Sequence, residues 1–540
     1  MRDVVMRDVV TSPGRRATYE AAGWWDDTTL AGRVVQIAAE RPDATAVVDD
    51  AGRRRTTYQQ LRDDAARLAG ALSRRGVGAG AVVSVQLPNT YEAVVTAVGV
   101  QSLGAVINPL LPNYRAKELT HVFTAARPTA IVTAAEYRGF DHRALVSDVS
   151  VTTGVHPLHV VVGGPGGDLS LDEVLSSRSH DDLMTAATAD AVSELIFTSG
   201  TEASPKAVMH TEQTTNFSVR VAHHDLGIGP ADVVWMPSPV GHSTGFNYGL
   251  RFALYHGLPL VLQDRWDPAT AIALIEAEGC SYTLAATTFL QDLVEEAGRT
   301  DVTLPSLRCF GCGGAPVPPD LVAAALDRGI TVLRLYGSTE VLVATWNRPA
   351  TPLDQRLHTD GRAMTHVEVE VRTEDGRPCA SGETGEIFVR GPDTCVGFFD
   401  DPDRTDATFD GDGWVRSGDL AVPDDRGHLT VAGRKKEIII RGGINIAPRE
   451  IEELLLTFPE VVRAAVIGVP DHRLGERSCA CVVLRPGAAL TLAETVARLR
   501  ALGLATFKLP ERLEVLDALP TTASGKIQKH ELVRALRDAS

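Results

Sequence analysis

The stretch Phe197-Thr198-Ser199-Gly200-Thr201-Glu202-Ala203-Ser204-Pro205-Lys206 decides the interpretation of this chain, because it joins an apolar strand to a short turn that carries hydroxyls, a glycine and a lysine. Backbone N–H groups and hydroxyls donate hydrogen bonds to phosphate oxygens, and an ammonium group neutralises their charge. The stretch lacks the Gly-x-x-x-x-Gly-Lys-Ser/Thr spacing of a Walker A loop. A surface turn rich in serine and threonine is the alternative. We interpret the stretch as a loop that binds the phosphates of a nucleoside triphosphate.

The composition is that of a globular protein with more than one hydrophobic core. The chain has 540 residues, of which 44% are hydrophobic and 23% are charged, so several subdomains are expected. Its net charge of −16 argues against a nucleic-acid partner, because phosphate backbones are bound by basic surfaces. Seven cysteines without a metal-binding pattern, and no visible signal peptide, predict a reducing, cytoplasmic location. Cys309 and Cys312 are expected to lie in a structural turn.

No membrane span is predicted. The most apolar segment, residues 94–111, contains Gln101, Ser102 and Asn108, and we interpret it as a buried helix followed by a strand. Residues 1–20 begin with the repeated sequence Met-Arg-Asp-Val-Val and are expected to be disordered.

The pattern of strands and helices predicts an α/β protein with three parts. From Ala44, short apolar strands alternate with amphipathic helices such as 58–75, which indicates a large domain of layered, mainly parallel sheets. After Asp354, alternating polar and apolar residues predict a small antiparallel or barrel-like β subdomain. From Gly433, strands and helices of a further small α+β domain follow. The strands predicted for the large domain are 46–48, 82–86, 130–132, 159–162, 260–262 and 282–284. The strands predicted for the two smaller parts are 367–371, 385–390, 428–431, 438–440, 464–467 and 479–484.

Five further motifs supply groups that suit a nucleotide. The ring of Tyr336 could stack on a purine, Thr339 could bond a phosphate oxygen, and Glu340 could hold Mg²⁺ on the phosphates. Asp419 suits the ribose hydroxyls, Gly313–Pro316 offers bare backbone to a flat ligand, Gly433–Glu437 carries three cations, and Lys526 stands on a flexible turn. Each residue also has a structural interpretation, as a core ring, a turn cap or a surface charge. The presence of all of them in this order favours the functional interpretation.

With these motifs the chain resembles the adenylate-forming (ANL) superfamily of acyl-CoA synthetases, carrier-loading adenylation domains and firefly-type luciferases. The resemblance runs from about Ala44 to Leu532. The stretch 236–246 is most similar to the acyl-CoA synthetase branch, in particular to cyclohexanecarboxylate–CoA ligase-like enzymes. The resemblance implies an AMP-binding N-terminal domain over 21–432, a hinge over 433–436 centred on Lys436, and a mobile C-terminal lid domain over 437–540.

The resemblance also implies roles for single residues. The catalytic residues are Lys526, His242, Glu340 and Thr201, and Glu340 and Thr201 are also the metal ligands. The residues that bind ATP or AMP are Thr198, Ser199, Gly200, Thr201, Lys206, Gly314, Ala315, Pro316, Tyr336, Gly337, Ser338, Thr339, Asp419 and Arg434. The CoA-binding residues are Arg441, Gly442 and Gly443. Adjacency to these motifs suggests an acyl pocket formed by His242, Gly245, Phe246, Tyr248, Ala285, Gly313 and Val341.

Some positions depart from the family pattern. Glu202 and Ala203 replace a Thr-Gly pair in the loop, and Ala207 replaces its last glycine. Alanine resists a positive φ angle, and Glu202 adds negative charge beside a polyphosphate. Before Lys526, Pro520-Thr521-Thr522 stands where the family often has Pro-Arg-Thr, so one cation is lost.

The sequence therefore predicts an ATP- and Mg²⁺-dependent ligase of secondary metabolism that converts a bulky apolar carboxylic acid to acyl-AMP and then to acyl-CoA. No carboxylate lies between Ser238 and Gly245 to pair the amine of an amino-acid substrate. Three alternatives stay open: an acyl-AMP ligase that loads a carrier protein, a non-catalytic nucleotide-binding protein and a luciferase-like oxygenase. A homodimer is a further expectation.

Overall fold

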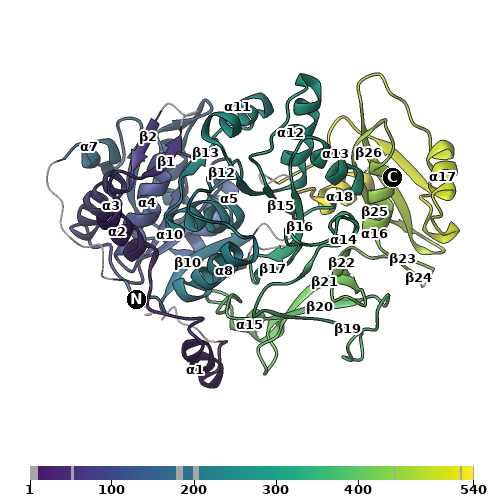
Figure 1. Cartoon of the computed structure of the whole chain (residues 1–540), viewed down its shortest axis with the longest axis horizontal. Coiled ribbons are helices and arrows are strands. Elements are labelled where there is room, and N and C mark those ends of the chain that lie inside the picture. Colours follow the sequence, from purple (N-terminus) through teal and green to yellow (C-terminus); the bar gives the residue numbers. More distant parts are fainter. Residues whose placement is uncertain are drawn as a thin grey trace.

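The strand before the predicted phosphate loop lies in a seven-stranded sheet. Figure 1 shows the computed structural model, which describes residues 10–49, 54–177, 187–198, 206–442, 444–522 and 526–538. The strands follow the order β11-β10-β4-β3-β5-β8-β9, and only the pair β10–β11 is antiparallel. They are β3 (Val82–Gln86), β4 (Val106–Pro109), β5 (Ala130–Ala134), β8 (Leu158–Val162), β9 (Leu169–Ser170), β10 (Val192–Thr198) and β11 (Lys206–Thr211).

Local sequence explains the helices that flank this sheet. Helix α3 (Tyr58–Ser73) starts at a capping box between Thr57 and Gln60, and its apolar stripe at Leu61, Ala65, Leu68 and Leu72 is buried. Helix α4 (Tyr91–Ser102) is buried on nearly every side and packs against α3. The apolar segment 94–111 is therefore a buried helix followed by strand β4. Among the described residues, no helix combines the length and apolarity that crossing a bilayer requires.

A nine-stranded sheet forms the second layer, in the order β18-β17-β16-β15-β14-β12-β13-β1-β2. Its central strands, from β16 to β1, run parallel. The strands are β1 (Thr45–Asp49), β2 (Arg54–Thr57), β12 (Val234–Met236), β13 (Leu260–Leu262), β14 (Tyr282–Ala285), β15 (Cys309–Gly313), β16 (Val332–Ser338), β17 (Leu342–Trp346) and β18 (Arg362–Ala363). Cys309 and Cys312 are buried in β15, so the expectation of a turn there is wrong.

The remaining helices of the large domain cover these sheets and connect their strands. They are α2 (Leu30–Glu40), α5 (Ala116–Ala126), α6 (His142–Thr153), α7 (Leu171–Ser176), α8 (Glu212–Asp225), α9 (Ser243–Gly245), the π-helix η2 (Phe246–Arg251), α10 (Phe252–His256), α11 (Pro268–Glu278), α12 (Thr287–Thr300), α13 (Pro319–Asp327) and α14 (Leu353–His358). A short hairpin pairs β6 (Glu136–Tyr137) with β7 (Phe140–Asp141). The mixed α/β fold class predicted from the sequence is confirmed.

The β subdomain is an antiparallel sheet of β19 (Glu368–Arg372), β20 (Gly385–Arg390), β21 (Val415–Pro423) and β22 (Leu429–Arg434), with helix α15 (Pro402–Thr408) beside it. Its strands follow the order β19-β20-β21-β22 and leave two edges, so the subdomain is an open sheet and not a closed barrel. Arg434 at the end of β22 precedes the short helix η3 (Lys435–Glu437), which contains the predicted hinge residue Lys436.

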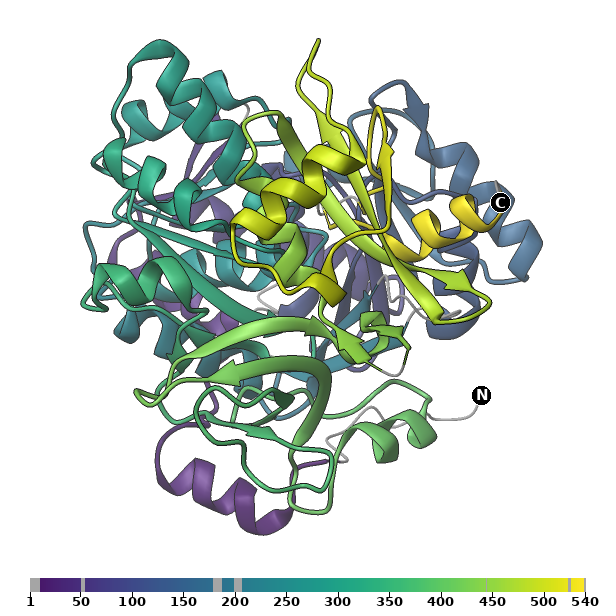
Figure 2. The same cartoon turned by 90° about the vertical axis from the view of Figure 1, so that its right-hand side faces the viewer.

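The C-terminal domain has its own sheet and its own core. Its strands are β23 (Ile439–Arg441), β24 (Ile444–Ile446), β25 (Val461–Asp471), β26 (Gly475–Leu484) and β27 (Arg512–Val515), and its helices are α16 (Pro448–Leu456), α17 (Leu492–Ala501), η4 (Thr506–Lys508) and α18 (Lys529–Asp538). Ile439, Ile451, Val466 and Val482 are among its fully buried core residues. Figure 2 shows this domain, in yellow-green, lying in front of the large domain.

Residues 13–21 form a helix, which corrects the expectation of disorder for the described part of residues 1–20. Ser12 caps helix α1 (Pro13–Ala21), which stands out at the lower edge of Figure 1. Arg15 donates a hydrogen bond to the Asp412 carbonyl oxygen (2.8 Å). The Trp25 indole is buried and donates to the Pro392 carbonyl oxygen (2.9 Å). The segment is held because these groups fasten it to the β subdomain.

All seven cysteines are free thiols. Six of them are buried, and only Cys379 is half-buried.

Trp25→Ala should lower the thermal stability of the protein. The substitution removes a large buried ring and leaves the Pro392 carbonyl without its donor, and truncations of this kind typically cost about 3–5 kcal/mol. Scanning calorimetry of wild-type, Trp25→Ala and Trp25→Phe proteins measures the effect. Trp25→Phe keeps most of the apolar volume, so its melting temperature should fall less than that of Trp25→Ala. An unchanged melting temperature for Trp25→Ala would show that the N-terminal segment does not contribute to the fold.

Candidate active site

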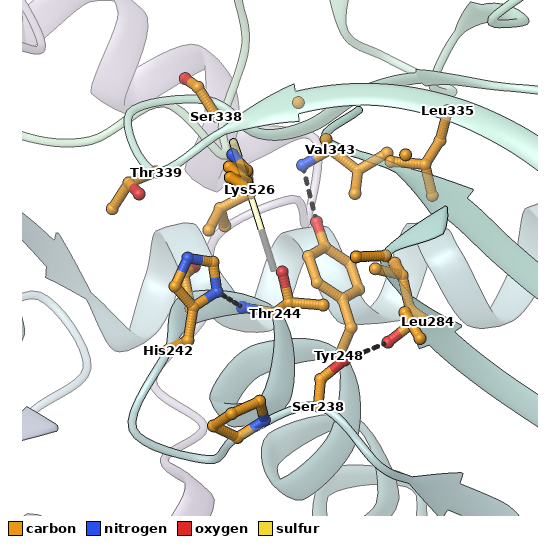
Figure 3. Close-up of a pocket in the computed structure, with 18 of the residues that line it drawn as sticks. Ser238, His242, Thr244, Tyr248, Leu284, Leu335, Ser338, Thr339, Val343 and Lys526 are labelled. Carbon is orange, nitrogen blue, oxygen red and sulfur yellow. Dashed lines mark hydrogen bonds between the residues drawn. The ribbon is translucent and has the colours of Figure 1, made fainter. Parts of the chain in front are cut away.

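The cavity that collects most of the predicted motifs has a volume of about 90 Å³ and lies where the large domain meets the C-terminal domain (Figure 3). The loop 238–244 and the π-helix η2 form one side, and the ends of β14, β15 and β16 form the other. The lining residues are Ser238, Pro239, His242, Ser243, Thr244, Tyr248, Leu284, Ala285, Ala286, Phe289, Gly313, Gly314, Leu335, Gly337, Ser338, Thr339, Leu342, Val343 and Lys526.

Lys526 enters this cavity from the C-terminal domain. Its turn is closed by hydrogen bonds between Lys526 and Thr522, one from the Thr522 amide (2.7 Å) and one to the Thr522 hydroxyl (3.1 Å). Gly314 adopts φ +80°, and a Cβ atom there would lie 3.1 Å from Lys526 Cε. Glycine therefore leaves room for the lysine stem. Burial lowers the pKa of Lys526 and Arg434 lowers it further, while Asp419 and Glu340 act in the opposite direction.

Lys206 and Glu340 form an ion pair beside the cavity. Burial alone would raise the pKa of Glu340, but the Lys206 ammonium, together with hydrogen bonds from the Glu340 amide and from Ser338, outweighs burial, and the pKa lies below its usual value. A single buried carboxylate with a nearby phosphate site suits Mg²⁺, which is commonly bound by one or two carboxylates together with phosphate oxygens and water. Among the described residues, no group of three His, Cys, Asp or Glu side chains could hold a metal by itself. The donor set therefore fits a metal that arrives with a nucleotide.

Tyr336, Asp419 and Arg434 form a second polar group near the cavity. The Tyr336 hydroxyl donates to Asp419 Oδ2 (2.8 Å), and Arg434 Nε lies 3.4 Å from Asp419 Oδ1. Asp419 on β21 and Arg434 on β22 are opposite each other in the sheet. Burial raises the pKa of Asp419, and Arg434 and the tyrosine hydroxyl oppose that rise. The group places an aromatic ring and a hydrogen-bond acceptor together, as adenosine recognition requires.

His242 stands at the mouth of the apolar part of the cavity. Its Nδ1 atom accepts a hydrogen bond from the Thr244 amide (3.3 Å; Figure 3). Burial, together with the positive charge of Lys526, lowers the pKa of His242 to about 4. The imidazole is therefore neutral at physiological pH and adds no charge to the cavity.

The structure brings only part of the predicted acyl pocket together. His242, Tyr248, Ala285 and Gly313 line the cavity, while three other predicted residues lie outside it. Phe246 faces a separate small cavity lined by Val85 and Leu87. A Cβ atom on Gly245 would lie 2.2 Å from the Pro239 carbonyl oxygen, so this glycine serves close packing. Val341 is fully buried in the core.

Tyr248 forms a fixed wall of the cavity. Its hydroxyl accepts a hydrogen bond from the Val343 amide (2.8 Å; Figure 3) and shares another with the Ser218 hydroxyl (2.7 Å). The apolar residues Leu284, Phe289, Leu335, Leu342 and Val343 complete this end, and sequence reasoning missed them. They stand beside recognised motifs, but only the strand register shows which of them point inward.

His210 is a further residue near the site that the sequence did not reveal. Its Nε2 atom donates to the Thr339 carbonyl oxygen (2.7 Å), because a carbonyl can only accept. Its Nδ1 atom then accepts from the Thr214 hydroxyl (3.0 Å). Burial lowers the pKa of His210 to about 4, so the neutral ring ties β11 to the turn that carries Glu340. A histidine in a strand gives no sequence signal for this role.

Other predicted residues lie outside the cavity or outside the described residues. Ala315 and Pro316 follow Gly314 without lining the cavity. Arg441 forms two hydrogen bonds with Glu511 (2.9 Å each), and Gly442 follows it with φ +59°. Four predicted residues, Ser199, Gly200, Thr201 and Gly443, lie outside the described residues, as do Glu202 and Ala203. Thr198 ends β10, and its buried hydroxyl has no hydrogen-bond partner among the described residues.

Ala207 replaces the last glycine of the family's loop, and the structure shows whether this position needs a positive φ angle. It lies in strand β11 opposite Phe197, and its carbonyl accepts a hydrogen bond from the Phe399 amide (2.9 Å). The position does not have a positive φ angle, so alanine fits it without strain.

Known proteins resemble this chain over nearly its whole length. The profile of the family described as "AMP-binding enzyme" matches residues 34–399, and that of the "AMP-binding enzyme C-terminal domain" matches residues 450–526. A medium-chain fatty-acid–CoA ligase from Escherichia coli (strain K12) is 37% identical over 523 residues, covering 95% of this chain and 92% of that protein.

Two further comparisons extend this likeness. A ligase from Rhodococcus jostii (strain RHA1), named for joining CoA to a propanoyl group on a methyl-dioxo-octahydroindene ring, is 34% identical and covers 94% of this chain and 98% of its own length. The crystal structure of ATP-bound MatB from Rhodopseudomonas palustris superposes with a TM-score of 0.84 at 27% identity, covering 94% of this chain and 99% of that one.

Lys206→Met should destabilise the protein more at pH 7.5 than at pH 4. The pKa of Glu340 is lowered in the folded state, so its carboxylate stabilises the fold above the usual glutamate pKa of about 4.3, and this contribution is lost as the pH falls. Removing Lys206 abolishes the contribution. Thermal unfolding at the two pH values measures the difference. The matched control is Lys435→Met, which breaks a more exposed pair with Glu386 (3.4 Å). If Lys206→Met lowered the melting temperature by the same amount at pH 7.5 and at pH 4, the electrostatic role of the Lys206–Glu340 pair would be contradicted.

Proposed function

We propose that this chain, which belongs to the AMP-binding enzyme family, is an ATP-dependent acyl-CoA synthetase that forms acyl-AMP from an apolar ring-bearing carboxylic acid and then transfers the acyl group to CoA. The main observation in support of this proposal is that Lys526 lines the cavity. This cation of the C-terminal domain lies in one cavity with Thr339, next to an apolar pocket in the other domain. The two relatives described above are both CoA ligases.

The shape and polarity of the pocket support an apolar acid. Among the described residues that line the cavity, none is an aspartate or a glutamate, so an amino-acid substrate would find no partner for its ammonium group there. The Tyr248 wall is braced by Ser218 and Val343. Because this wall closes the pocket, we expect compact rings to bind better than long flexible chains.

In the first step, the substrate carboxylate attacks the α-phosphate of ATP, the bond to the β-phosphate breaks, and acyl-AMP and pyrophosphate form. A carboxylate is ionised at neutral pH, so no general base is needed. Lys526 neutralises charge that develops at the α-phosphate, and Thr339 donates a hydrogen bond there. Tyr336 stacks on adenine, and Asp419 accepts hydrogen bonds from the ribose hydroxyls. Mg²⁺ would be held by Glu340 and would supply further charge neutralisation on the phosphates.

In the second step, the CoA thiol attacks the acyl carbonyl and AMP leaves. Lys526 occupies the cavity that the thiol must enter, so the C-terminal domain has to turn away first. Rotation about Lys436 would remove Lys526 and present Arg441, Gly442 and Gly443. Glycines on that face would leave space for the pantetheine arm.

Lys526→Ala should separate the two half-reactions. Formation of acyl-AMP, measured as pyrophosphate release, should fall by about a hundred- to a thousandfold, because removal of one preorganised contact to developing charge typically has this effect. Conversion of supplied acyl-AMP and CoA to acyl-CoA should stay within a fewfold of the wild-type rate. If both half-reactions declined together, the proposed exchange of the two faces would be wrong.

A substrate and acceptor screen tests the proposed function itself. Pyrophosphate release should be faster with cyclohexanecarboxylic or benzoic acid than with palmitic acid, and acyl-CoA should form with CoA alone. Detection of acyl-CoA by mass spectrometry without added carrier protein distinguishes a CoA ligase from a carrier-loading ligase. Acyl-AMP formation without any thioester would favour the carrier-loading alternative, and no pyrophosphate release with any acid would favour a non-catalytic protein.

A further inference from the structure

One buried carboxylate receives cations from both domains. Asp360 belongs to the large domain and is 2% exposed. Arg334 of β16 donates to its Oδ1 atom through Nε (3.1 Å) and Nη2 (3.0 Å). From the C-terminal domain, Arg449 at the start of α16 donates through Nη2 to both carboxylate oxygens (3.3 and 3.2 Å). We name these three residues the Asp360 clasp.

Arg449 and Lys526 are linked within the C-terminal domain. Helix α16 carries Glu452, one turn beyond Arg449, and its carboxylate pairs with Lys529 (2.7 Å). Lys529 is the first residue of α18, three residues after Lys526, and it also pairs with Glu437 next to the hinge (3.1 Å). Two partly buried ion pairs therefore link α16, the hinge region and the start of α18, which follows Lys526 by three residues.

Each half of the clasp remains satisfied when the domains separate. Asp360 keeps Arg334 and the Val431 amide, which donates to Oδ2 (2.9 Å). Arg449 keeps Glu453, to which its Nε atom donates (3.0 Å). The loss of a buried ion pair is strongly destabilising when it leaves a buried charge without a partner. Separation of Arg449 from Asp360 leaves no such charge. The contact can form and break during each catalytic cycle.

We propose that Arg449 is a positioning residue for the adenylation step, and that its pairing with Asp360 stabilises the domain orientation in which Lys526 occupies the cavity. This inference rests on the proposed two-step function. The clasp belongs to one orientation only, because rotation about Lys436 carries α16 away from Asp360 while Arg334 stays behind. Arg449 thus biases the domain equilibrium towards the first half-reaction without touching a substrate.

The test measures both half-reactions for Arg449→Gln. Pyrophosphate release from ATP and acid should fall about tenfold or more, which lies within the usual range of coupling between protein states. Conversion of supplied acyl-AMP and CoA should be unchanged or faster, since that step uses the other orientation. Arg449→Lys keeps the charge and should recover part of the first step. Equal losses in both half-reactions, or no loss in the first, would overturn the inference.

The matched control is Arg485→Gln. Arg485 also pairs across the domains, with Glu295 (3.3 Å), but both side chains are about half exposed. Exposed pairs contribute little, so this variant should change neither half-reaction. Melting temperatures of all variants identify any loss of folding.

A readout independent of catalysis separates failure of this inference from failure of the proposed function. Arg434, Lys435 and Lys436 are exposed at the hinge, and trypsin cleaves after such residues. Arg449→Gln should release the C-terminal fragment several times faster than wild-type or Arg485→Gln protein, because the hinge opens more often. A wild-type protein inactive with every acid would refute the proposed function, while unaltered hinge cleavage in Arg449→Gln would refute the clasp whatever the activity.

Discussion

The proposed site depends on one cation, the ammonium group of Lys526, which the C-terminal domain contributes to a cavity lined mainly by the large domain. Lys526 lies in the cavity against the bare backbone of Gly314, and its pKa is lowered by burial and by Arg434. Asp419 and Glu340 offset this cost. An ammonium group held among carboxylates in a poorly hydrated space interacts strongly with a phosphate. In the proposed two-step reaction, a lysine fixed permanently in the cavity would be unsuitable, because the second substrate needs the same space. A two-domain arrangement with the proposed hinge would satisfy both demands.

Charged and apolar residues are separated around the cavity. The ion pairs Lys206–Glu340 and Asp419–Arg434 lie near the cavity without lining it. Tyr248, neutral His242 and aliphatic side chains line it together with Lys526. In the proposed reaction, an acid with an apolar body would place its carboxylate near Lys526 and its body against the apolar lining. Polarity would then orient the acid, and Tyr248, held by Ser218 and Val343, would form a wall of the space it occupies.

Most of the fold, and about half of the residues of the candidate site, could be predicted from the sequence. The apolar run 82–86 and the amphipathic pattern 58–75 located β3 and α3 within two residues, since burial dictates such patterns. Motif residues such as Tyr336 on β16 and Asp419 on β21 come together because a hydrogen bond joins strands of two different sheets. Leu284, Val343 and His210 could not be found in this way: each looks like an ordinary strand residue, and only register shows which way it points. The ordered N-terminal segment was missed because Arg15 and Trp25 are held by backbone carbonyls about four hundred residues away.

The distribution of thiols has a practical consequence for spectroscopy. Six cysteines are sealed inside the protein, and burial raises the pKa of Cys280, Cys309 and Cys312 to about 12, so they are poor nucleophiles towards maleimides. Cys379 is the half-buried exception and lies in the β subdomain, on the large-domain side of the proposed hinge. A fluorophore attached there, paired with an acceptor introduced on the β25–β26 hairpin, would report domain rotation in solution without prior removal of native thiols.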